Sequence, residues 1–592
     1  MRLIFYFIFA FNLLLPKSMM AQESRTDWWT DARFGMFIHW GLYSGAEGLW
    51  KGEKIRHFNN YAEWIKYRNR IPTEEYGKLA ERFVWDDINP EEWVLLAKNA
   101  GMHYITITAK HHDGFALWDT KVGSYSFKNY DPKSRDIIAE LADACKKHDM
   151  KLGFYYSHWV DWEHPYGWDH NRELTKDLTD AQFDQYWQEK VIPQIQELLT
   201  NYGDIAMLWF DMWIPHQQTI VKERQLRQII DMVRELQPAC LINSRLGLPV
   251  SDPEIDFETL GDNQLGAVYQ NNPWQTPGTI AHSWGYHALE NDWKSTNQLL
   301  QALINNVSLN GNFMLNIGPR ADGSLPYESI SRLEDMGKWL AINGESIYKA
   351  GGLELRARQY DWGKITYKRE GTANKVYLHV FNWPLDRILR FTGILNKPSS
   401  VYLLSDKLQN PLEFKQSGPS LHIALPHKQP DPYISVLVLE YENNLELETK
   451  VAAESSFGGV SLNYSNELLQ LNKSTKLDRV SPEYISLEKE TKLEWQVYMK
   501  EAGEKQLSIS YANPSKTPVE ISVGNDTQKS IQAFLSPTGK IVVEPNENFY
   551  TEEFVDSHLS RMDFPEPGYY TITLNAKLDK GEKLRLNWIW IE

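Results

Sequence analysis

Eight short apolar segments alternate with amphipathic helical segments between about residues 30 and 348. The segments that predict strands are 34–39, 103–108, 152–156, 205–211, 241–245, 255–258, 279–282 and 313–317, with 255–258 and 279–282 the weakest. The helical patterns fall between them: one opens at Asn89-Pro90-Glu91-Glu92, and the others cover 134–148, 183–202, 223–236 and 297–309. This alternation is typical of a parallel α/β fold, and eight strands favour a closed (β/α)8 TIM-type barrel. An open doubly wound sheet is the alternative, disfavoured because no glycine-rich phosphate loop follows the first strand.

The pattern changes after Gly351 to short alternating runs separated by turn residues. Such runs predict antiparallel sheets, so we expect a β-sandwich over 349–444 and a second C-terminal β-rich domain over 445–592. In that last domain Trp495-Gln496-Val497-Tyr498, followed by Gly503 and by 506–511, resembles a carbohydrate-binding module, and a purely structural sandwich is the alternative. No Asp-x-Asp-x-Asp pattern for calcium occurs there.

The first 21 residues have the pattern of a secretory signal peptide. Arg2 is followed by an uncharged apolar run from Leu3 to Leu15, and Ala21-Gln22 is a plausible cleavage point. The run is short for a membrane span, so an anchor is the disfavoured alternative. We therefore expect a secreted or periplasmic protein whose catalytic barrel occupies 22–348.

Charge and cysteine content narrow the class of partner. The formal net charge is −16, and it becomes −18 when Arg2 and Lys17 are removed with the signal peptide. An acidic chain argues against nucleic acid or an anionic membrane as partner and fits a neutral substrate. The two cysteines, Cys145 and Cys240, lie in apolar segments, which favours buried free thiols over a disulfide. Nothing in the sequence indicates an oligomeric state.

Polar and aromatic side chains gather where the predicted barrel strands end. In a barrel these ends face one shared pocket. The residues at these positions are His39, His111, His112, Tyr156, Trp209, Asp211 and Arg245. Imidazole, phenol and guanidinium groups can bind hydroxyls while indole rings cover carbon, so the set suits an uncharged polyol.

A metal site is the competing interpretation of the adjacent histidines. His111 and His112 are neighbours on or just past a strand, and such neighbours point to opposite faces. The sequence contains neither a His-x-His nor a His-Glu-x-x-His motif. We expect no metal and no other cofactor.

Asp211 ends the apolar segment 205–211, where a carboxylate either pairs structurally or takes part in chemistry. The structural possibility is a salt bridge to Arg245. Retaining glycosidases place a nucleophilic carboxylate at such a position, close to a second carboxyl group that serves as acid and then base.

The ordered motifs of the barrel resemble glycoside hydrolase family 29, the retaining α-L-fucosidases. The motifs are Arg33-Phe34-Gly35-x-Phe37-x-His39-Trp40-Gly41, Glu63-Trp64, His111-His112-Asp113-Gly114, Tyr155-Tyr156-Ser157, Trp209-Phe210-Asp211, Asn243-Ser244-Arg245, Ser283-Trp284-Gly285-Tyr286 and Leu315-Asn316-Ile317-Gly318-Pro319. The resemblance implies a barrel followed by a β-sandwich, and Asp211 as the nucleophile. It further implies a fucose-binding set: His39, Glu63, Trp64, His111, His112, Tyr156, Trp209, Arg245 and Trp284, the last forming a wall against the sugar's methyl group.

The general acid is where the sequence departs from the family pattern. Gln275 stands in a segment that normally reads Trp-Glu-Thr, and a carboxamide cannot give up a proton near neutral pH. We therefore assign Gln275 to substrate binding and look for the acid in the loop that follows Arg245. Asp262 and Glu258 are the available carboxylates there, and we favour Asp262 because it lies in the loop beyond the strand.

Three functions follow from this pattern. The first is an exo-acting retaining α-L-fucosidase that releases terminal fucose from oligosaccharides or glycoconjugates. The second is a fucose-binding protein on an inactive glycosidase scaffold, suggested by Gln275 and opposed by the intact Asp211 motif. The third keeps the enzyme but changes the sugar, for example to an α-L-galactoside.

Overall fold

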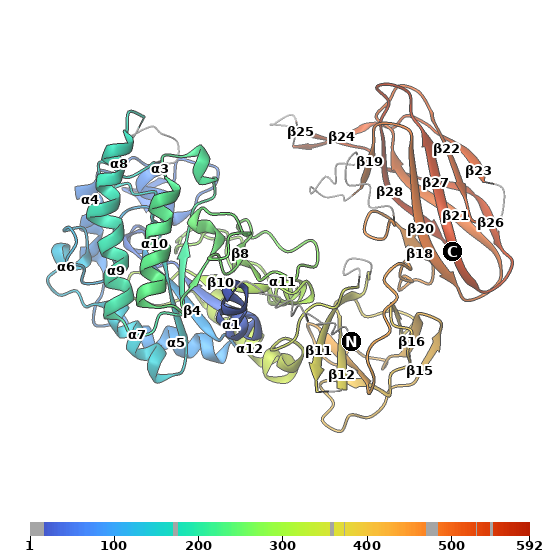
Figure 1. Ribbon diagram of the computed structural model, residues 1–592, viewed down its shortest axis with the longest axis horizontal. Coiled ribbons are helices and arrows are strands. Elements are labelled where there is room, and N and C mark those ends of the chain that lie inside the picture. Colours follow the sequence, from blue (N-terminus) through green and yellow to red (C-terminus); the bar gives the residue numbers. More distant parts are fainter. Residues whose placement is uncertain are drawn as a thin grey trace, which may run out of the picture. The chain divides into compact units, whose positions relative to one another are not determined.

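The computed structural model describes residues 17–169, 176–355, 360–371, 373–468, 484–527, 530–544 and 549–592. The chain divides into two compact units, Met1–Gly351 and Gly352–Glu592, and each is described by itself. Figure 1 shows helices around a central sheet in the first unit and only sheets and loops in the described part of the second.

The first unit is built on eight parallel strands. Their order in the sheet is β7-β6-β5-β4-β1-β10-β9-β8. The bounds are β1 Phe34–Ile38, β4 Tyr104–Lys110, β5 Lys151–Tyr156, β6 Met207–Phe210, β7 Leu241–Ile242, β8 Glu258–Thr259, β9 Trp274–Thr279 and β10 Asn312–Ile317. A parallel bridge between Asn243 and Phe257 joins the two edges of this order, so the sheet closes on itself. The predicted (β/α)8 barrel is confirmed.

Helices alternate with the strands and cover the outside of the barrel (Figure 1). The longer ones are α5 Pro90–Asn99, α7 Ile137–Lys147, α9 Ile192–Asn201, α10 Glu223–Leu236, α11 Thr296–Ser308 and α12 Tyr327–Asn343, and shorter ones are α2 Leu42–Ala46, α3 Ile65–Arg68, α4 Thr73–Gly77, α6 Phe127–Tyr130 and α8 Asp180–Tyr186. The start of α5 shows why the sequence pattern worked. Asn89 accepts a hydrogen bond from the Glu91 backbone N–H, and Pro90 occupies the first helical position.

Two predicted elements differ from the structure for a local reason. The seventh strand is Trp274–Thr279, earlier than the predicted 279–282, because Pro277 and the polar residues beside it hide a strand that pairs with β10. The segment predicted as one helix over 183–202 is broken into α8 and α9 by a π-helical turn over Trp187–Val191. Pro193 follows that turn. Proline has no backbone N–H to donate, and in a regular α-helix its ring clashes with the carbonyl group four residues earlier, so the helix is irregular at this point.

The barrel interior is filled by large side chains and, among the described residues, leaves no open channel through the barrel. The buried cluster contains Phe37, Tyr104, Tyr155, Met207, Trp209, Leu241, Phe257 and Met314. Helix α1, Lys17–Ala32, adds Trp29, whose ring lies 4.5 Å from that of Phe257. The predicted apolar signal segment Leu3–Leu15 lies outside the described residues. Within the described residues, no helix is both long enough and apolar enough to cross a membrane.

The second unit consists of antiparallel sheets in two groups. The first group, here the sandwich part, has the sheets β11-β12-β17-β14 and β13-β16-β15. Its strands are β11 Gly363–Glu370, β12 Ala373–Val380, β13 Ile388–Thr392, β14 Ser400–Leu403, β15 Phe414–Ser417, β16 Ser420–Ala424 and β17 Ser435–Tyr441. A core of buried aliphatic and aromatic residues, including Trp362 and Phe391, lies between them.

The second group, here the terminal part, pairs the sheet β18-β28-β21-β26 with the sheet β20-β27-β22-β23. Its strands are β18 Val460–Leu462, β19 Ile485–Leu487, β20 Thr491–Met499, β21 Gly503–Ala512, β22 Val519–Gly524, β23 Ile531–Leu535, β26 Val555–Phe564, β27 Gly568–Lys577 and β28 Leu584–Ile591, with β24 Lys540–Glu544 and β25 Phe549–Glu552 forming a separate ribbon. The buried core centres on Trp495. The predicted antiparallel sheets after the barrel are confirmed.

Both cysteines are free and buried, as predicted. Burial raises the pKa of each thiol, Cys145 and Cys240, to about 12. They therefore act as small apolar side chains in the barrel.

Candidate active site

A pocket of about 380 Å³ opens at the carboxyl ends of the barrel strands. Its predicted residues are His39, Glu63, Trp64, His111, His112, Trp209, Asp211, Arg245, Asp262 and Trp284. The sequence analysis missed a second group that also lines it: Phe37, Asn59, Tyr61, Arg68, Tyr155, Trp213 and Gly261. The structure therefore brings together ten of the predicted residues, and leaves Tyr156, Glu258 and Gln275 outside.

Asp211 lies at the floor of the pocket, directly after β6, with 14% of its side chain exposed. One carboxylate oxygen accepts from Arg245 at 2.8 Å, and the other accepts from the Tyr155 hydroxyl at 2.9 Å. Burial opposes its ionisation, but His112 and Arg245 outweigh that effect and hold the pKa of Asp211 below its ordinary value. The carboxylate is therefore ionised and fixed in orientation, with access to the pocket.

Asp262 is the second carboxylate of the pocket, and it lies at the mouth with 49% of its side chain exposed. The same guanidinium serves both acids, because Arg245 donates from its other terminal nitrogen to Asp262 at 2.7 Å. The next residue, Asn263, fixes the loop by accepting from the Thr279 backbone N–H. Glu258 begins β8 and does not line the pocket, so Asp262 is the predicted loop acid that shares the pocket with Asp211.

The hydrogen bonds of His39 determine which ring nitrogen faces the sugar. Asn316 donates its amide to the Trp284 carbonyl at 2.7 Å, which leaves its side-chain oxygen facing His39 Nδ1 at 2.6 Å. Nδ1 therefore carries the proton, and burial lowers the pKa of His39 to about 3, so the ring is neutral. Nε2 is left as an acceptor for a hydroxyl group of a ligand.

His111 and His112 are adjacent in the chain but have different environments. His111 is buried in the pocket wall, and its Nδ1 has no hydrogen-bond partner among the described residues. His112 Nδ1 lies 2.7 Å from the Ser157 hydroxyl, which itself donates to the Val160 carbonyl, so Nδ1 must donate to Ser157. Nε2 of the same ring faces Asp211 at 3.4 Å. Ser157 thus holds the His112 ring beside the nucleophile candidate, while His111 lines the pocket.

Glu63 is a buried carboxyl group with one oxygen unsatisfied. Its Oε2 accepts from the Gly285 backbone N–H at 2.9 Å, whereas Oε1 has no partner among the described residues. Burial outweighs the Gly285 bond and raises the pKa of Glu63 to about 7. Oε2 accepts from Gly285, so the proton of the neutral carboxyl lies on Oε1. A buried polar atom without a partner costs free energy, so Oε1 is a site for a sugar hydroxyl, to which it can donate.

The raised pKa of Glu63 gives a prediction about pH and stability. Between pH 4.5 and 7 the carboxyl ionises in the unfolded chain but stays protonated in the folded one, so stability falls as pH rises through this window. The shift corresponds to about 3 kcal/mol. We expect Glu63→Gln to be more stable than the parent by a few kcal/mol at pH 8 and by much less at pH 4, measured by urea unfolding followed through barrel tryptophan fluorescence. The exposed Glu235→Gln in α10 is the matched control, and an equal response of the two variants would contradict this account.

Tyr156 was predicted to line the pocket, and this prediction is wrong. In β5 the side chain of Tyr156 points away from the barrel interior and donates to Gln194 in helix α9 at 2.8 Å. Tyr155 occupies the inner face instead, stacked on Trp209 with ring centroids 5.5 Å apart. The parallel register pairs Tyr155 with Trp209, so these two side chains lie on the same face of the sheet. Tyr156, the next residue in the strand, must then point to the opposite face.

Gln275 was predicted to contact substrate, and this prediction is also wrong. The side chain is fully buried in the barrel interior, on β9. It accepts from the Trp209 indole N–H at 3.0 Å and donates to the Tyr104 hydroxyl at 2.9 Å. Its amide has both a donor and an acceptor in use, so Gln275 holds Trp209 in place below the pocket. It does not occupy the position of a proton donor.

This placement gives a prediction for Gln275→Glu. A glutamate there would lose the donor to Tyr104 and place a carboxyl group in a dry interior, at a cost of about 1–3 kcal/mol. We expect lower stability and no gain in hydrolysis of a fucosylated oligosaccharide. Thermal unfolding and initial rates on the same preparation test both parts. A large rise in rate would instead mean that the acid reaches the pocket from β9.

Fold and site together define a barrel-fold glycoside hydrolase, because a polyol-sized pocket of histidines and indoles holds two carboxylates on one guanidinium. Residues 16–345 match the sequence profile of the family described as Alpha-L-fucosidase. The chain therefore belongs to the α-L-fucosidases, glycoside hydrolase family 29.

Individual relatives agree with this assignment. The chain is 27% identical to the tissue α-L-fucosidase of Bos taurus over 416 residues, which cover 68% of this chain and 85% of that protein. It is 26% identical to an α-L-fucosidase of Dictyostelium discoideum over 74% of this chain and 99% of the relative. The crystal structure of an α-L-fucosidase from Vibrio sp. strain EJY3 matches with a TM-score of 0.77 and 26% identity, over 96% of this chain and 98% of that one.

Proposed function

We propose that this chain is an exo-acting, retaining α-L-fucosidase in which Asp211 is the nucleophile and Asp262 the acid and base. The observation that supports this most is the pair of carboxylates on opposite arms of Arg245, one on the pocket floor and one at its mouth. In a retaining mechanism the nucleophile attacks the anomeric carbon while the acid protonates the departing oxygen, and the acid then activates water. The buried, ionised group suits the first role, and the exposed group suits the second.

The solved structure of a Bacteroides thetaiotaomicron α-L-fucosidase trapped as a covalent intermediate with 2-fluoro-fucosyl fluoride agrees with this mechanism. It matches with a TM-score of 0.62 and 27% identity over 72% of this chain. We extend the covalent mechanism from that relative to Asp211. A pocket of about 380 Å³ has room for one terminal sugar ring, which suits exo action on the end of a glycan.

The remaining pocket residues bind the sugar. His39 Nε2, the His111 ring and Glu63 Oε1 are the groups that await hydroxyl partners. Trp284 packs against His39 with ring centroids 5.1 Å apart and forms an apolar wall. Such a wall favours the methyl group of fucose over the hydroxymethyl group of an α-L-galactoside by about 1–3 kcal/mol, or about 10–200-fold.

The test is hydrolysis of aryl α-L-fucoside and aryl α-L-galactoside, with the first-formed sugar anomer followed by NMR. We expect the fucoside to be preferred and α-L-fucose to appear first. First-formed β-L-fucose would overturn the retaining mechanism, and preference for the galactoside would change the sugar. The alternative of a fucose-binding protein without activity was suggested by Gln275. Because Gln275 accepts from Trp209 in the barrel core, it no longer indicates a lost acid. That alternative would be supported only by fucose binding without turnover of either substrate.

We further propose that the protein is exported, since residues 1–21 carry a positive start, an apolar run and a small-residue exit. Its substrate would then be a fucosylated glycan outside the cytoplasm. Fractionation of cells expressing the full chain, with and without residues 1–21, tests this. Equal distribution of the two forms would contradict export.

A further inference from the structure

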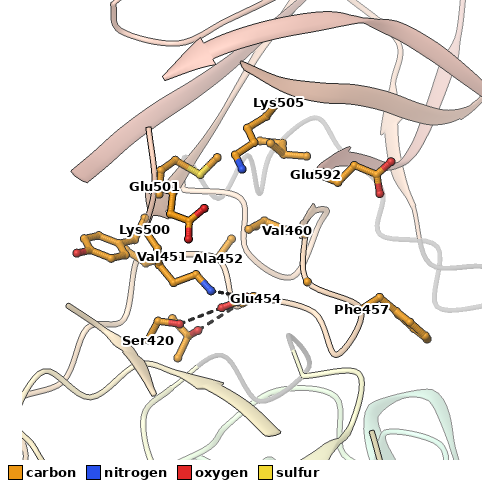
Figure 2. Close-up of a pocket in the computed structure, with 16 residues that line it drawn as sticks. Ser420, Val451, Ala452, Glu454, Phe457, Val460, Lys500, Glu501, Lys505 and Glu592 are labelled. Atoms are coloured by element: carbon orange, nitrogen blue, oxygen red, sulfur yellow. Dashed lines mark hydrogen bonds and ion pairs between the residues drawn. The ribbon is translucent and has the colours of Figure 1, made fainter. Parts of the chain in front are cut away.

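A second cavity, of about 280 Å³, lies within the second unit, where the sandwich part meets the terminal part (Figure 2). Its wall combines Thr392 and Ser420 of the sandwich part with the segment 451–460 and the ends of β20, β21 and β28. The barrel pocket, which suits one sugar ring, measures about 380 Å³. The second cavity therefore belongs to the size class of a single sugar residue.

Its framework is held by part-buried and exposed polar contacts around Glu454 and Asp361. Glu454 accepts from Lys500 at 2.7 Å and from His422 at 2.8 Å. Burial would raise the pKa of Glu454, but these two partners outweigh it and lower the pKa to about 2. Asp361 accepts from the hydroxyls of Ser455 and Ser456 at 2.6 and 2.7 Å, which fixes the turn that follows. The cavity wall is therefore already in place before any ligand arrives.

Two charged groups at this cavity are not used by the framework. Among the described residues, neither the Lys505 ammonium nor the Glu501 carboxylate has a hydrogen-bond or ion-pair partner. Figure 2 shows both groups directed toward the space around Val460. Glu501 is exposed and Lys505 is half-buried, so water satisfies both groups in the free protein. A ligand hydroxyl could replace that water by donating to Glu501 or accepting from Lys505.

An aromatic side chain, Phe457, lies among the residues that line the same cavity. Phe457 is 82% exposed at the tip of the fixed turn, where Gly458 has the left-handed φ of 95°. Gly459 lines the cavity and leaves room for the Trp590 ring, since a Cβ there would lie 2.6 Å from it. The Trp590 N–H donates to Glu592, which also lines the cavity. An exposed ring on a rigid turn has an apolar face available to the C–H face of a sugar.

We propose that this cavity is a second carbohydrate-binding site, which holds one neutral sugar residue of a glycan apart from the barrel pocket. Glu454 is paired with Lys500 and His422, so the charged side chains that remain are Lys505, Glu501 and Glu592, the last accepting from the Trp590 indole N–H. Together they offer hydrogen-bond donors and acceptors to several hydroxyls. Val451, Val460 and Ile591 supply an apolar lining for carbon.

The experiment measures retention of the full chain in native gels that contain gastric mucin, a fucosylated glycoprotein, on the Asp211→Asn background. We compare three proteins: this parent, the parent with Lys505→Ala and Glu501→Ala, and the parent with Phe457→Ala. We expect the double change to raise the apparent dissociation constant by about tenfold or more, because hydrogen bonds to charged groups are lost. Phe457→Ala, at an exposed position that does not affect folding, should raise it several-fold.

The matched control removes one lysine and one glutamate from another surface of the terminal part, Lys583→Ala with Glu488→Ala, which form an exposed pair at 3.3 Å. Equal retention of the control and of the Lys505/Glu501 variant would overturn the proposal, as would a parent that is not retained by mucin. Hydrolysis of an aryl fucoside, measured with Asp211 intact, should stay within about twofold in every variant, because the residues that line the barrel pocket belong to the first unit and the changes lie in the second. Loss of that activity as well would place the effect on the barrel and also overturn the proposal.

Discussion

Replacing Asp211 with asparagine is expected to reduce α-L-fucoside hydrolysis by about 10⁴-fold or more, because an amide cannot form the covalent intermediate. The change keeps the size of the side chain and leaves an oxygen to accept from Arg245 or Tyr155. Folding should therefore be preserved. Initial rates on an aryl α-L-fucoside, together with circular dichroism of the same preparation, give the measurement.

External azide separates loss of the nucleophile from general damage. In Asp211→Ala the space at the pocket floor admits azide, which would attack the substrate directly from that side and give β-L-fucosyl azide. Recovery of this inverted product would establish Asp211 as the group that attacks the anomeric carbon. Full activity of Asp211→Asn would overturn the assignment.

Replacing Asp262 with asparagine is expected to lower the rate on a fucosylated oligosaccharide by about 10²–10⁴-fold, the usual contribution of general acid–base catalysis. The loss should be smaller in the first step for an aryl fucoside with a good leaving group, because such a group departs with little protonation. Rates on a series of aryl fucosides of increasing leaving-group pKa measure this dependence.

Two comparisons make the Asp262 experiment decisive. Glu258→Gln is the matched control, since Glu258 does not line the pocket and its loss should leave the rate within about threefold. Azide added to Asp262→Asn should intercept the covalent intermediate and give α-L-fucosyl azide, the opposite anomer from the Asp211→Ala product. Equal losses for both leaving-group classes, or a collapse with Glu258→Gln alone, would remove Asp262 from the role.

The barrel could be predicted from the sequence because its strands are apolar on both faces. The strand that precedes Asp211 and the strand Asn312–Ile317 are buried throughout, and such runs stand out from amphipathic helices. The strand with Pro277 did not stand out, because its position is decided by pairing with β10 and not by its own composition. The hydrophobic pattern thus located the strands that are apolar along their own length. It missed β9, whose position depends on pairing with β10.

The candidate site was predictable wherever a strand end fixed the residue, as for His39 and Asp211. It was not predictable where the choice between two faces mattered. Tyr155 and Tyr156 are identical in type and differ only in the direction that the barrel register gives them. Gln275 was misplaced for the same reason, because its depth in the barrel depends on the strand register, which no single segment encodes.

The single guanidinium between Asp211 and Asp262 has a consequence for the order of events. If these groups act as proposed, formation of the covalent intermediate removes the negative charge of Asp211, and the whole attraction of Arg245 then falls on Asp262. That favours the ionised form of Asp262 at the moment when water must be deprotonated. Arg245 would thus couple the change of Asp262 from acid to base to the formation of the covalent bond at Asp211.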